Sequence, residues 1–355
     1  MITIAAGHMI GIGTRLLERA GAAEAVAARV STEIVSNALA GHDSHGITLL
    51  PRFLDDIDTG KIRPQAEPTV AMKGPGLALV DGHRGFGQLT MLEAMATAIR
   101  VAGDQGAASV SVTDCNHVGM LWNYAHSAAK AGVIGLIWCV SGPDGGGGVM
   151  APFGGRRTAI GNNPLAIGIP AGRHQPMVLD ISSSAVAGGK VVWYAQQGKS
   201  IPQGWIIDED GRPTTDPTKL FQGDGFQQIA GALLPMAGHK GFGLALAGEI
   251  LAGILSGYGS NNLSQYREGN GAFIVAIDVK FFLPPQVFGA QVDALFDYVK
   301  SIPTDDQTDE ILIPGEIEQR TRAEREKAGI PVTEKIWAEL VERGRSVGIA
   351  VEASA

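Results

Sequence analysis

Apolar residues recur at helical spacing through the first sixty residues of the chain. Between residues 23 and 40 they include Val26, Val30 and Ile34, which fall near the 3.6-residue period of an α-helix. Gly41 is expected to end this helix. A further helix is predicted from residue 47 to residue 58, and the proline-bearing stretch 62–68 is predicted to be a connector.

Short β-rich runs replace this pattern between residues 77 and 181: LALVD, SVSVTD, GVIGLIWCV, PLAIGIP and MVLDIS. Helical stretches at residues 88–101 and 121–130 separate them. Another helix is predicted for residues 239–256, another strand for 272–283, and helices again from about residue 291. These patterns indicate a mixed α/β (α+β) protein. They divide it into a helical part (1–75), an α/β part (76–288) and a helical part (289–355) that packs back on the first helices.

Composition narrows the possible functions. Apolar residues make up 45% and charged residues 18% of the 355 residues, which excludes disorder as the overall state. The net charge of −8 provides no attraction for a nucleic-acid backbone or an anionic membrane surface. The longest apolar run is far shorter than the roughly 20 residues of a membrane helix. Because the N-terminus lacks the basic segment of a secretory signal, we expect a cytoplasmic protein.

A dinucleotide-binding fingerprint of the Rossmann type is absent. Such a fingerprint, GxGxxG, would lie between a strand and a helix. The triplets Gly85-Phe86-Gly87 and Gly241-Phe242-Gly243 begin it, but neither continues to the third glycine. Any nicotinamide cofactor must therefore bind in another way.

The densest cluster of ionisable residues is residues 42–46, HDSHG. Together with the preceding Gly41 they form the motif GHDSHG, which lies between two predicted helices. A histidine here can exchange protons near neutral pH, because its ordinary pKa is about 6.5. The same residues could instead cap a helix through Asp43 and Ser44. A metal site formed by His42, Asp43 and His45 is a further alternative, although such short spacing seldom directs three ligands to one point.

Three other positions are candidates for a binding site. His117 follows a predicted strand, where binding residues are common. Asp180 ends the apolar run MVLD and could be a carboxylate at the end of a sheet or an ordinary turn residue. His239 and Lys240 begin an apolar helix, whose free N–H groups favour an anion.

Taken together, a series of motifs resembles the malate/L-lactate dehydrogenase family, whose fold is not the Rossmann one. The motifs are AGHDSHGITLLPRF, TDCNHVG, APFGG, GNNPLAIGIP, VLDISSS, WIIDEDGRPTTDP, LLPMAGHKGFGLAL and ILIPGE. They extend over essentially the whole chain, in order, and several are most similar to the hydroxycarboxylate dehydrogenase B branch. The resemblance implies a malate/L-lactate (sulfolactate) dehydrogenase-like fold, with a discontinuous mixed sheet in the cofactor domain and a helical domain built from both termini.

The resemblance also implies a reaction, in which NADH or NADPH reduces a 2-oxo acid or a related imino acid. His45 matches the residue that gives a proton to the substrate carbonyl, or accepts one in the oxidation direction, and His117 matches a second active-site histidine. The substrate-binding positions would include Ser44, Asn162 and Asn163. Asn162 stands where the family usually has threonine.

The cofactor positions implied by the resemblance fall in three segments. The cofactor would be NAD or NADP, and the sequence does not distinguish them. No metal is implied. The matching residues are Pro176, Met177, Val178, Leu179, Asp180, Ile181, Ser182, His239, Lys240 and Gly315.

One position departs from the family in a way that affects the substrate. Many relatives carry arginine four residues after the catalytic histidine, where a guanidinium can bind a carboxylate through two hydrogen bonds, whereas this chain has Leu49. Arg52, seven residues after His45, is the cation we expect in its place. Other candidates are Arg84, Arg156 and Arg157. Leu49 could also widen the pocket for a bulky apolar substrate.

Three alternatives to the 2-hydroxyacid dehydrogenase remain open from the sequence. One is a ketimine reductase that acts on a cyclic imino acid. Another is a metal-dependent hydrolase that uses His42, Asp43, His45 and His117. The third is a cofactor-binding protein that has lost catalysis. For the dehydrogenase, the resemblance implies a homodimer. It also implies a small 2-oxo or 2-hydroxy acid as the molecule that the enzyme binds.

Overall fold

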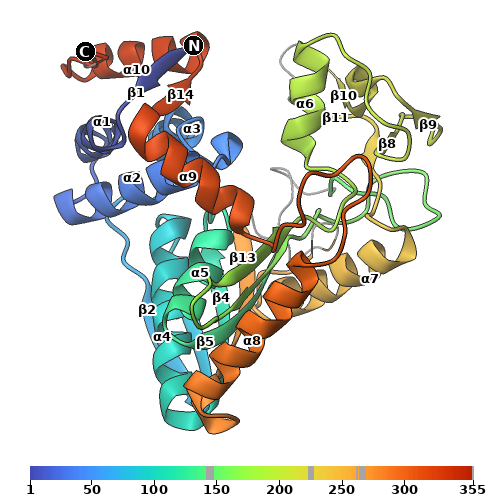
Figure 1. The fold of residues 1–355 in the computed structure, drawn as a ribbon. Coiled ribbons are helices and arrows are strands. Elements are labelled where there is room, and N and C mark those ends of the chain that lie inside the picture. The colour runs from blue at the N-terminus through green and yellow to red at the C-terminus, as the bar shows by residue number, and fades with distance from the viewer. Residues whose placement is uncertain (141–147, 223–227, 261–262, 264–268, 354–355) are drawn as a thin grey trace.

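The computed structural model describes residues 1–140, 148–222, 228–260, 263 and 269–353. Three parts are visible in Figure 1: a helical domain at one side, a central sheet with its covering helices, and a small lobe at the other side. No helix among these residues is long and apolar enough to cross a membrane.

The helical domain is formed by both ends of the chain, which lie close together in Figure 1. Strand β1 pairs antiparallel with β14, and the buried side chains of the N-terminal helices share one core with Ile330, Val332 and Leu340. Phe53 is fully buried there, and burial of such a side chain stabilises a fold by about 1.5–3 kcal/mol. The elements are β1 (Ile2–Ile4), α1 (Ala6–Arg19), α2 (Glu24–Leu39), η1 (Asp43–His45), α3 (Leu49–Asp58), α9 (Glu316–Ala328), β14 (Ile330–Val332) and α10 (Glu334–Ser346).

Seven strands of the described chain form the central sheet, in the order β2-β3-β4-β13-β5-β6-β7. Strands β3 and β4 are parallel and all other neighbours are antiparallel. The sheet is therefore mixed, as the sequence predicted. Its strands are β2 (Thr69–Gly74), β3 (Leu77–Asp81), β4 (Ala107–Cys115), β5 (Val133–Val140), β6 (Leu165–Ile169), β7 (Met177–Ile181) and β13 (Asn270–Asp278).

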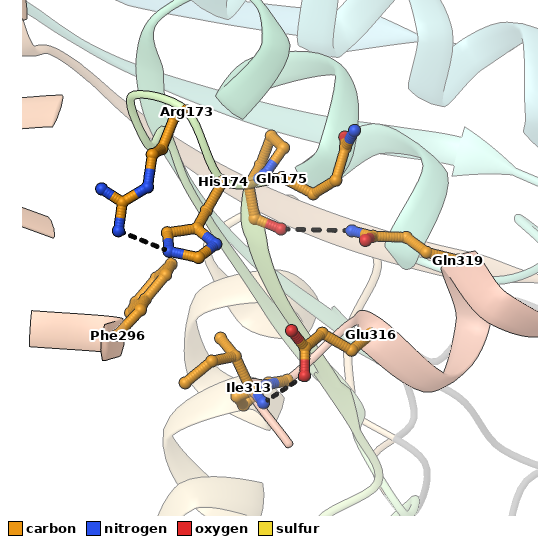
Figure 2. A pocket seen from close by; sticks show the side chains of 9 residues that line it. Arg173, His174, Gln175, Phe296, Ile313, Glu316 and Gln319 are labelled. Atoms are coloured by element: carbon orange, nitrogen blue, oxygen red, sulfur yellow. Dashed lines mark hydrogen bonds between the residues drawn. The ribbon is translucent and has the colours of Figure 1, made fainter. Parts of the chain in front are cut away.

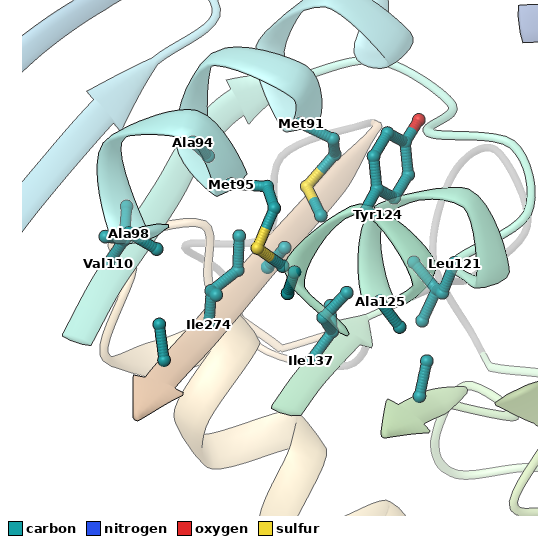
Figure 3. Close-up of a cluster of buried hydrophobic side chains, with 14 of the residues drawn as sticks. Met91, Ala94, Met95, Ala98, Val110, Leu121, Tyr124, Ala125, Ile137 and Ile274 are labelled. Carbon is teal, nitrogen blue, oxygen red and sulfur yellow. The ribbon is translucent and has the colours of Figure 1, made fainter. Parts of the chain in front are cut away.

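Helices cover both faces of the sheet. On one face, α4 (Gly87–Gln105) and α5 (Trp122–Lys130) bury Met91, Met95 and Tyr124 against Ile137 and Ile274 of the strands, as Figure 3 shows. On the other face, α7 (His239–Gly248) continues into the π-helical turn η3 (Glu249–Ile254), which packs on β5 and β13. The run of residues after β13 forms η4 (Val279–Phe281) and then α8 (Pro285–Lys300).

The small lobe contains one helix and several two-residue strands within the described part of the chain. Its core includes Val191, Ile206 and Leu220. Its elements are α6 (Gly188–Gln196), β8 (Ile206–Ile207), β9 (Pro213–Thr214), η2 (Pro217–Leu220), β10 (Phe221–Gln222), β11 (Gln228–Ile229) and β12 (Ala232–Leu233).

The predicted element boundaries differ from the structure in three places. The predicted division after residue 75 falls between β2 and β3, which pair with each other, and the division at 289 falls inside α8. The strand predicted for residues 272–283 ends at Asp278, because the Asp278 carboxylate accepts the Lys280 N–H at 3.0 Å and turns the chain into η4.

Candidate active site

A cleft of about 830 Å³ lies where the helical domain, the sheet and the small lobe meet. It brings together nine of the polar or titratable residues singled out from the sequence: His42, Asp43, Ser44, His45, Arg52, His117, Asn162, Asp180 and Ser182. They come from the η1 turn, α3, the segment after β4, and the β6–β7 region.

The turn that carries His45 is fixed by backbone and side-chain contacts. After α2, Gly41 adopts the left-handed conformation (φ +90°), which glycine permits at low cost. The His45 N–H then donates to the His42 carbonyl at 2.9 Å, and Thr48 Oγ1 donates to the Asp43 carbonyl at 2.7 Å. These bonds close a short 3₁₀ turn that directs His45 to the cleft.

His117 lies on a second turn, immediately after β4. The Gly119 N–H donates to His117 Nδ1 at 3.1 Å, so the neutral ring carries its proton on Nε2. The ring centroids of His117 and His45 are 5.6 Å apart. Ser44 Oγ lies 3.0 Å from His45 Nδ1.

Burial favours the uncharged form of both histidines. Burial lowers the pKa of His45 to about 4, with a smaller contribution from nearby His42. Burial also lowers the pKa of His117 well below its usual range, and His45 and Arg52 add to the effect. Neutral imidazoles can accept a proton from a bound hydroxyl group.

Asp180 lies on β7, and its carboxylate accepts the N–H of Trp122, the first residue of α5, at 2.8 Å. Burial raises the pKa of Asp180 to about 6, which outweighs the opposite effect of this hydrogen bond. The residue therefore joins the edge strand of the sheet to the start of α5, and it also faces the cleft.

Arg52 and Leu49 of α3 have different surroundings, Arg52 at the cleft and Leu49 in the core of the helical domain. Arg52 lines the cleft with a half-exposed side chain, and its Nε lies 3.5 Å from an Asp56 carboxylate oxygen. Leu49 is buried in the core of the helical domain and does not line the described cleft. It therefore does not widen the cleft in the way that the sequence suggested. Arg84, Arg156 and Arg157 are not among the cleft-lining residues.

Neighbouring asparagines have different surroundings. Asn162 lines the cleft, whereas Asn163 is 1% exposed. Asn163 Nδ2 donates to the Ala245 carbonyl at 2.9 Å and to a Glu249 carboxylate oxygen at 2.6 Å. The side chain of Asn163 thus fastens the cleft wall to α7 and η3.

The segments that resemble family cofactor positions lie in separate places. Asp180 and Ser182 line the cleft, while Pro176, at the other end of β7, lines a smaller pocket of about 260 Å³ (Figure 2). Gly315 packs against β7, where a Cβ would lie 3.2 Å from the backbone N and O of Val178. Met177, Leu179 and Ile181 are partly buried within β7, and His239 and Lys240 are exposed at the start of α7 and do not line the described cleft.

The smaller pocket lies between α8, α9 and the loop before β7. Glu316 accepts the Ile313 N–H at 3.0 Å and pairs with Lys300, and Gln319 Nε2 donates to the Pro176 carbonyl at 3.4 Å. Figure 2 shows His174 beside Phe296 on the opposite side, where the two ring planes are tilted by 59° and their centroids lie 5.9 Å apart. Strand β7 therefore connects this pocket to the larger cleft.

Some cleft residues had no signal in the sequence. Lys190 and Trp193 extend from α6 of the small lobe, and Asn270 comes from the start of β13. Helix α6 is short and lacks a strong helical period, and β13 is distant in sequence from the strands it separates.

The donor atoms around His45 do not converge as a metal site would require. Asp43 pairs with Arg325 of α9, and His42 Nε2 lies 3.3 Å from a Glu318 carboxylate oxygen. Within the described chain, no group of three or more His, Cys, Asp or Glu side chains is placed to hold a metal ion.

Comparison with known proteins places this arrangement in a family. Residues 4–341 match the model of the malate/L-lactate dehydrogenase family. Hydroxycarboxylate dehydrogenase B of Escherichia coli (strain K12) is 33% identical over 341 residues, or 94% of this chain and 91% of the relative.

Two solved structures have the same fold. Sulfolactate dehydrogenase from Methanocaldococcus jannaschii has a TM-score of 0.88 and 30% identity, covering 99% of this chain and 98% of that one. Delta1-piperideine-2-carboxylate reductase from Pseudomonas syringae pvar. tomato has a TM-score of 0.83 and 26% identity, covering 97% and 100%. The non-Rossmann fold implied by the sequence motifs is thereby confirmed. The chain belongs to the malate/L-lactate dehydrogenase family of oxidoreductases.

Proposed function

We propose that this oxidoreductase interconverts a 2-oxo acid and a 2-hydroxy acid, with NADH or NADPH as the hydride donor. The observation that carries the proposal is the pair His45 and His117, 5.6 Å apart in a cleft that also presents Arg52 and Asp180. A proton-transfer group, a cation for a carboxylate and a large cleft are what this reaction requires.

His45 moves the proton. In the oxidation direction its neutral ring accepts the hydroxyl proton of the substrate, which agrees with its lowered pKa of about 4. In the reduction direction the ring must be protonated. A bound carboxylate favours this, because a nearby negative charge raises the pKa of a histidine.

The other side chains orient the substrate. His117 carries its ring proton on Nε2 and donates it to the substrate oxygen. Arg52 binds the carboxylate, since it is the arginine among our four candidates that reaches the cleft. Ser44 and Asn162 supply further hydrogen bonds, while Asn163 holds the wall behind them.

The residues at the two ends of β7 would hold the cofactor. Asp180 and Ser182 lie at the cleft end, and Pro176 and Gly315 lie at the end with the smaller pocket. When bound, the nicotinamide supplies the hydride for C2 of the acid. The remaining residues of the 176–182 segment form the strand that presents these groups, and His239 and Lys240 offer a cation at the start of α7.

We also propose a homodimer. Helix α7 and the turn η3 expose Leu246, Ile250 and Ile254, which recur every four residues on one face. Exposed apolar surface of this kind is typical of a protein–protein interface.

A ketimine reductase is the second candidate. It is favoured by the structural similarity to delta1-piperideine-2-carboxylate reductase. Both reactions deliver a hydride to a carbon beside a carboxylate, so the same side chains would serve.

The test is nicotinamide absorbance with purified protein, NADH and NADPH in parallel, aliphatic and aromatic 2-oxo acids, and one cyclic imine. Turnover of an oxo acid that disappears in His45→Asn, with cofactor binding retained, supports the proposal. Turnover of the imine alone supports the reductase. Cofactor binding without any turnover contradicts both reactions.

A further inference from the structure

Asn37 lies beneath both histidine turns, although it takes no part in the chemistry proposed above. It is located near the end of α2 and is only 2% exposed. Its Nδ2 donates to the carbonyl of His45 at 2.9 Å. Its backbone carbonyl accepts the His42 N–H at 3.0 Å. Asn37 therefore binds the η1 turn at its start, through the His42 N–H, and at its end, through the His45 carbonyl.

The same amide also touches the turn of His117. Asn37 Nδ2 lies 3.0 Å from the position that a Cβ on Gly119 would occupy. Gly119 has φ +76°, and its N–H is the group that donates to His117 Nδ1. Asn37 therefore packs closely against the glycine whose N–H binds the second histidine.

The orientation of the Asn37 amide is determined by its second partner. Asn37 Oδ1 accepts a hydrogen bond from Asn123 Nδ2 at 2.8 Å, and the same Nδ2 donates to Glu33 Oε2 at 3.0 Å. Asn123 Oδ1 in turn accepts from Ser36 Oγ at 3.3 Å. A flipped Asn37 amide would oppose its oxygen to the His45 carbonyl and its nitrogen to the Asn123 donor, so one orientation satisfies both ends.

Asn123 brings the sheet into this arrangement. It follows Trp122, whose N–H is bound by Asp180 of β7. On the other side, Arg322 of α9 donates to Ser36 Oγ at 2.8 Å. The chain of hydrogen bonds therefore runs from α9 through α2 to α5, across the boundary between the helical domain and the sheet.

We propose that Asn37 is a positioning residue that sets the relative placement of His45 and His117. The proposal rests on the function proposed above only for its effect on turnover. Its structural part, the placement of two rings by one amide, can be measured without a substrate.

Asn37→Asp and Asn37→Leu test it. Asp keeps the shape and the acceptor for Asn123 but loses the donor to the His45 carbonyl, and Leu loses both. Displacement of a catalytic group by about 1 Å can cost about 100-fold in rate, so we expect kcat to fall about 10- to 100-fold in both variants. The affinity for cofactor should stay within about twofold. Ser31→Ala is the matched control, because Ser31 is buried on the same helix but faces α1.

Histidine side-chain NMR on ¹⁵N-labelled protein gives the independent readout. Besides His42 and His117, the charged or titratable side chains that line the cleft with His45 include Asp43, Arg52, Asp180 and Lys190. In Asn37→Asp, the added carboxylate at residue 37 should raise the pKa of His45. Asn37→Leu should alter the tautomer balance of His117 without raising the pKa of His45.

The outcomes separate the two proposals. Unchanged histidine signals and unchanged kcat in both folded variants would overturn the positioning role of Asn37, whatever the wild-type enzyme reduces. Altered histidine signals in a protein that turns over no oxo acid or imine would support the positioning role and contradict the proposed function. Equal loss of activity in Ser31→Ala would show that α2 acts only as scaffold, which also overturns the role.

Discussion

Replacement of Arg52 by methionine tests whether this side chain binds the substrate carboxylate, since position 49, where the family resemblance led us to expect an arginine, is leucine. Methionine keeps most of the length of the side chain and removes the charge. The variant should fold, since Arg52 is half exposed and its ion pair with Asp56, at 3.5 Å, is a surface i,i+4 pair worth about 0.3–0.5 kcal/mol.

The magnitude follows from the kind of bond that is lost. A hydrogen bond to a charged group contributes about 1.5–3 kcal/mol, and each ~1.4 kcal/mol is a factor of ten in affinity. Solvent near the half-exposed guanidinium favours the lower part of this range, so KM for the 2-oxo acid should rise about 10- to 50-fold. Because the carboxylate is bound equally before and during hydride transfer, kcat should change much less.

Initial rates with a 2-oxo acid and with its amide give the assay. The wild-type enzyme should prefer the acid, and Arg52→Met should lose most of that preference. Arg157→Met is the control, because Arg157 is an exposed arginine that does not line the cleft. An unchanged KM and an unchanged preference for the acid in Arg52→Met would refute the assignment.

Four further predictions concern the protonation of His45 (two of them), the turn that carries it and the assembly. Burial lowers the pKa of His45 from 6.5 to about 4, so kcat/KM for hydroxy acid oxidation should fall only as the pH drops toward about 4, and a fall centred near 6.5 would contradict this. Between pH 6.5 and 4 the unfolded chain binds more protons at His45 than the folded chain does, so the free energy of unfolding should decrease as the pH falls through this range. Denaturant titrations should show a smaller decrease in His45→Asn. Gly46→Ala should destabilise the fold by about 1–3 kcal/mol, measured by calorimetry, because its Cβ would lie 2.9 Å from Ala38 Cβ and 3.1 Å from Ala38 Cα; an unchanged melting temperature would show that the turn can move. Ile250→Asp should shift a dimer toward monomer in light scattering, whereas a wild-type monomer would contradict the proposed interface.

The local elements could be predicted from the sequence because their signals are local. The apolar spacing of α2 and the β-rich runs of β4 to β7 depend on neighbouring residues only. The order of the strands could not be predicted in this way. Strand β13 lies between β4 and β5, more than a hundred residues away in sequence, and such pairing depends on the whole chain. Strand β2 was not predicted from the sequence; it directly follows the proline-bearing connector.

The candidate site could be predicted in part for a similar reason. His45 and His117 follow the ends of a helix and a strand, where the chain turns and side chains become available for binding. The surroundings of Leu49 were harder to predict, because positions less than one helical turn apart on α3 face either the cleft, as Arg52 does, or the core, as Leu49 does. The α6 wall, with Lys190 and Trp193, gave no signal, since its place depends on how the small lobe packs.

The cleft draws its groups from parts of the protein that fold around separate cores. The helical domain supplies His45 and Arg52, and the sheet supplies His117 and Asp180. Two rings on separate cores keep a fixed distance only if specific contacts join those cores. The hydrogen bond between Asn37 and Asn123 is such a contact, and it is partly buried between α2 and α5. If His45 and His117 act together as we propose, their relative placement depends on the boundary between the helical domain and the sheet.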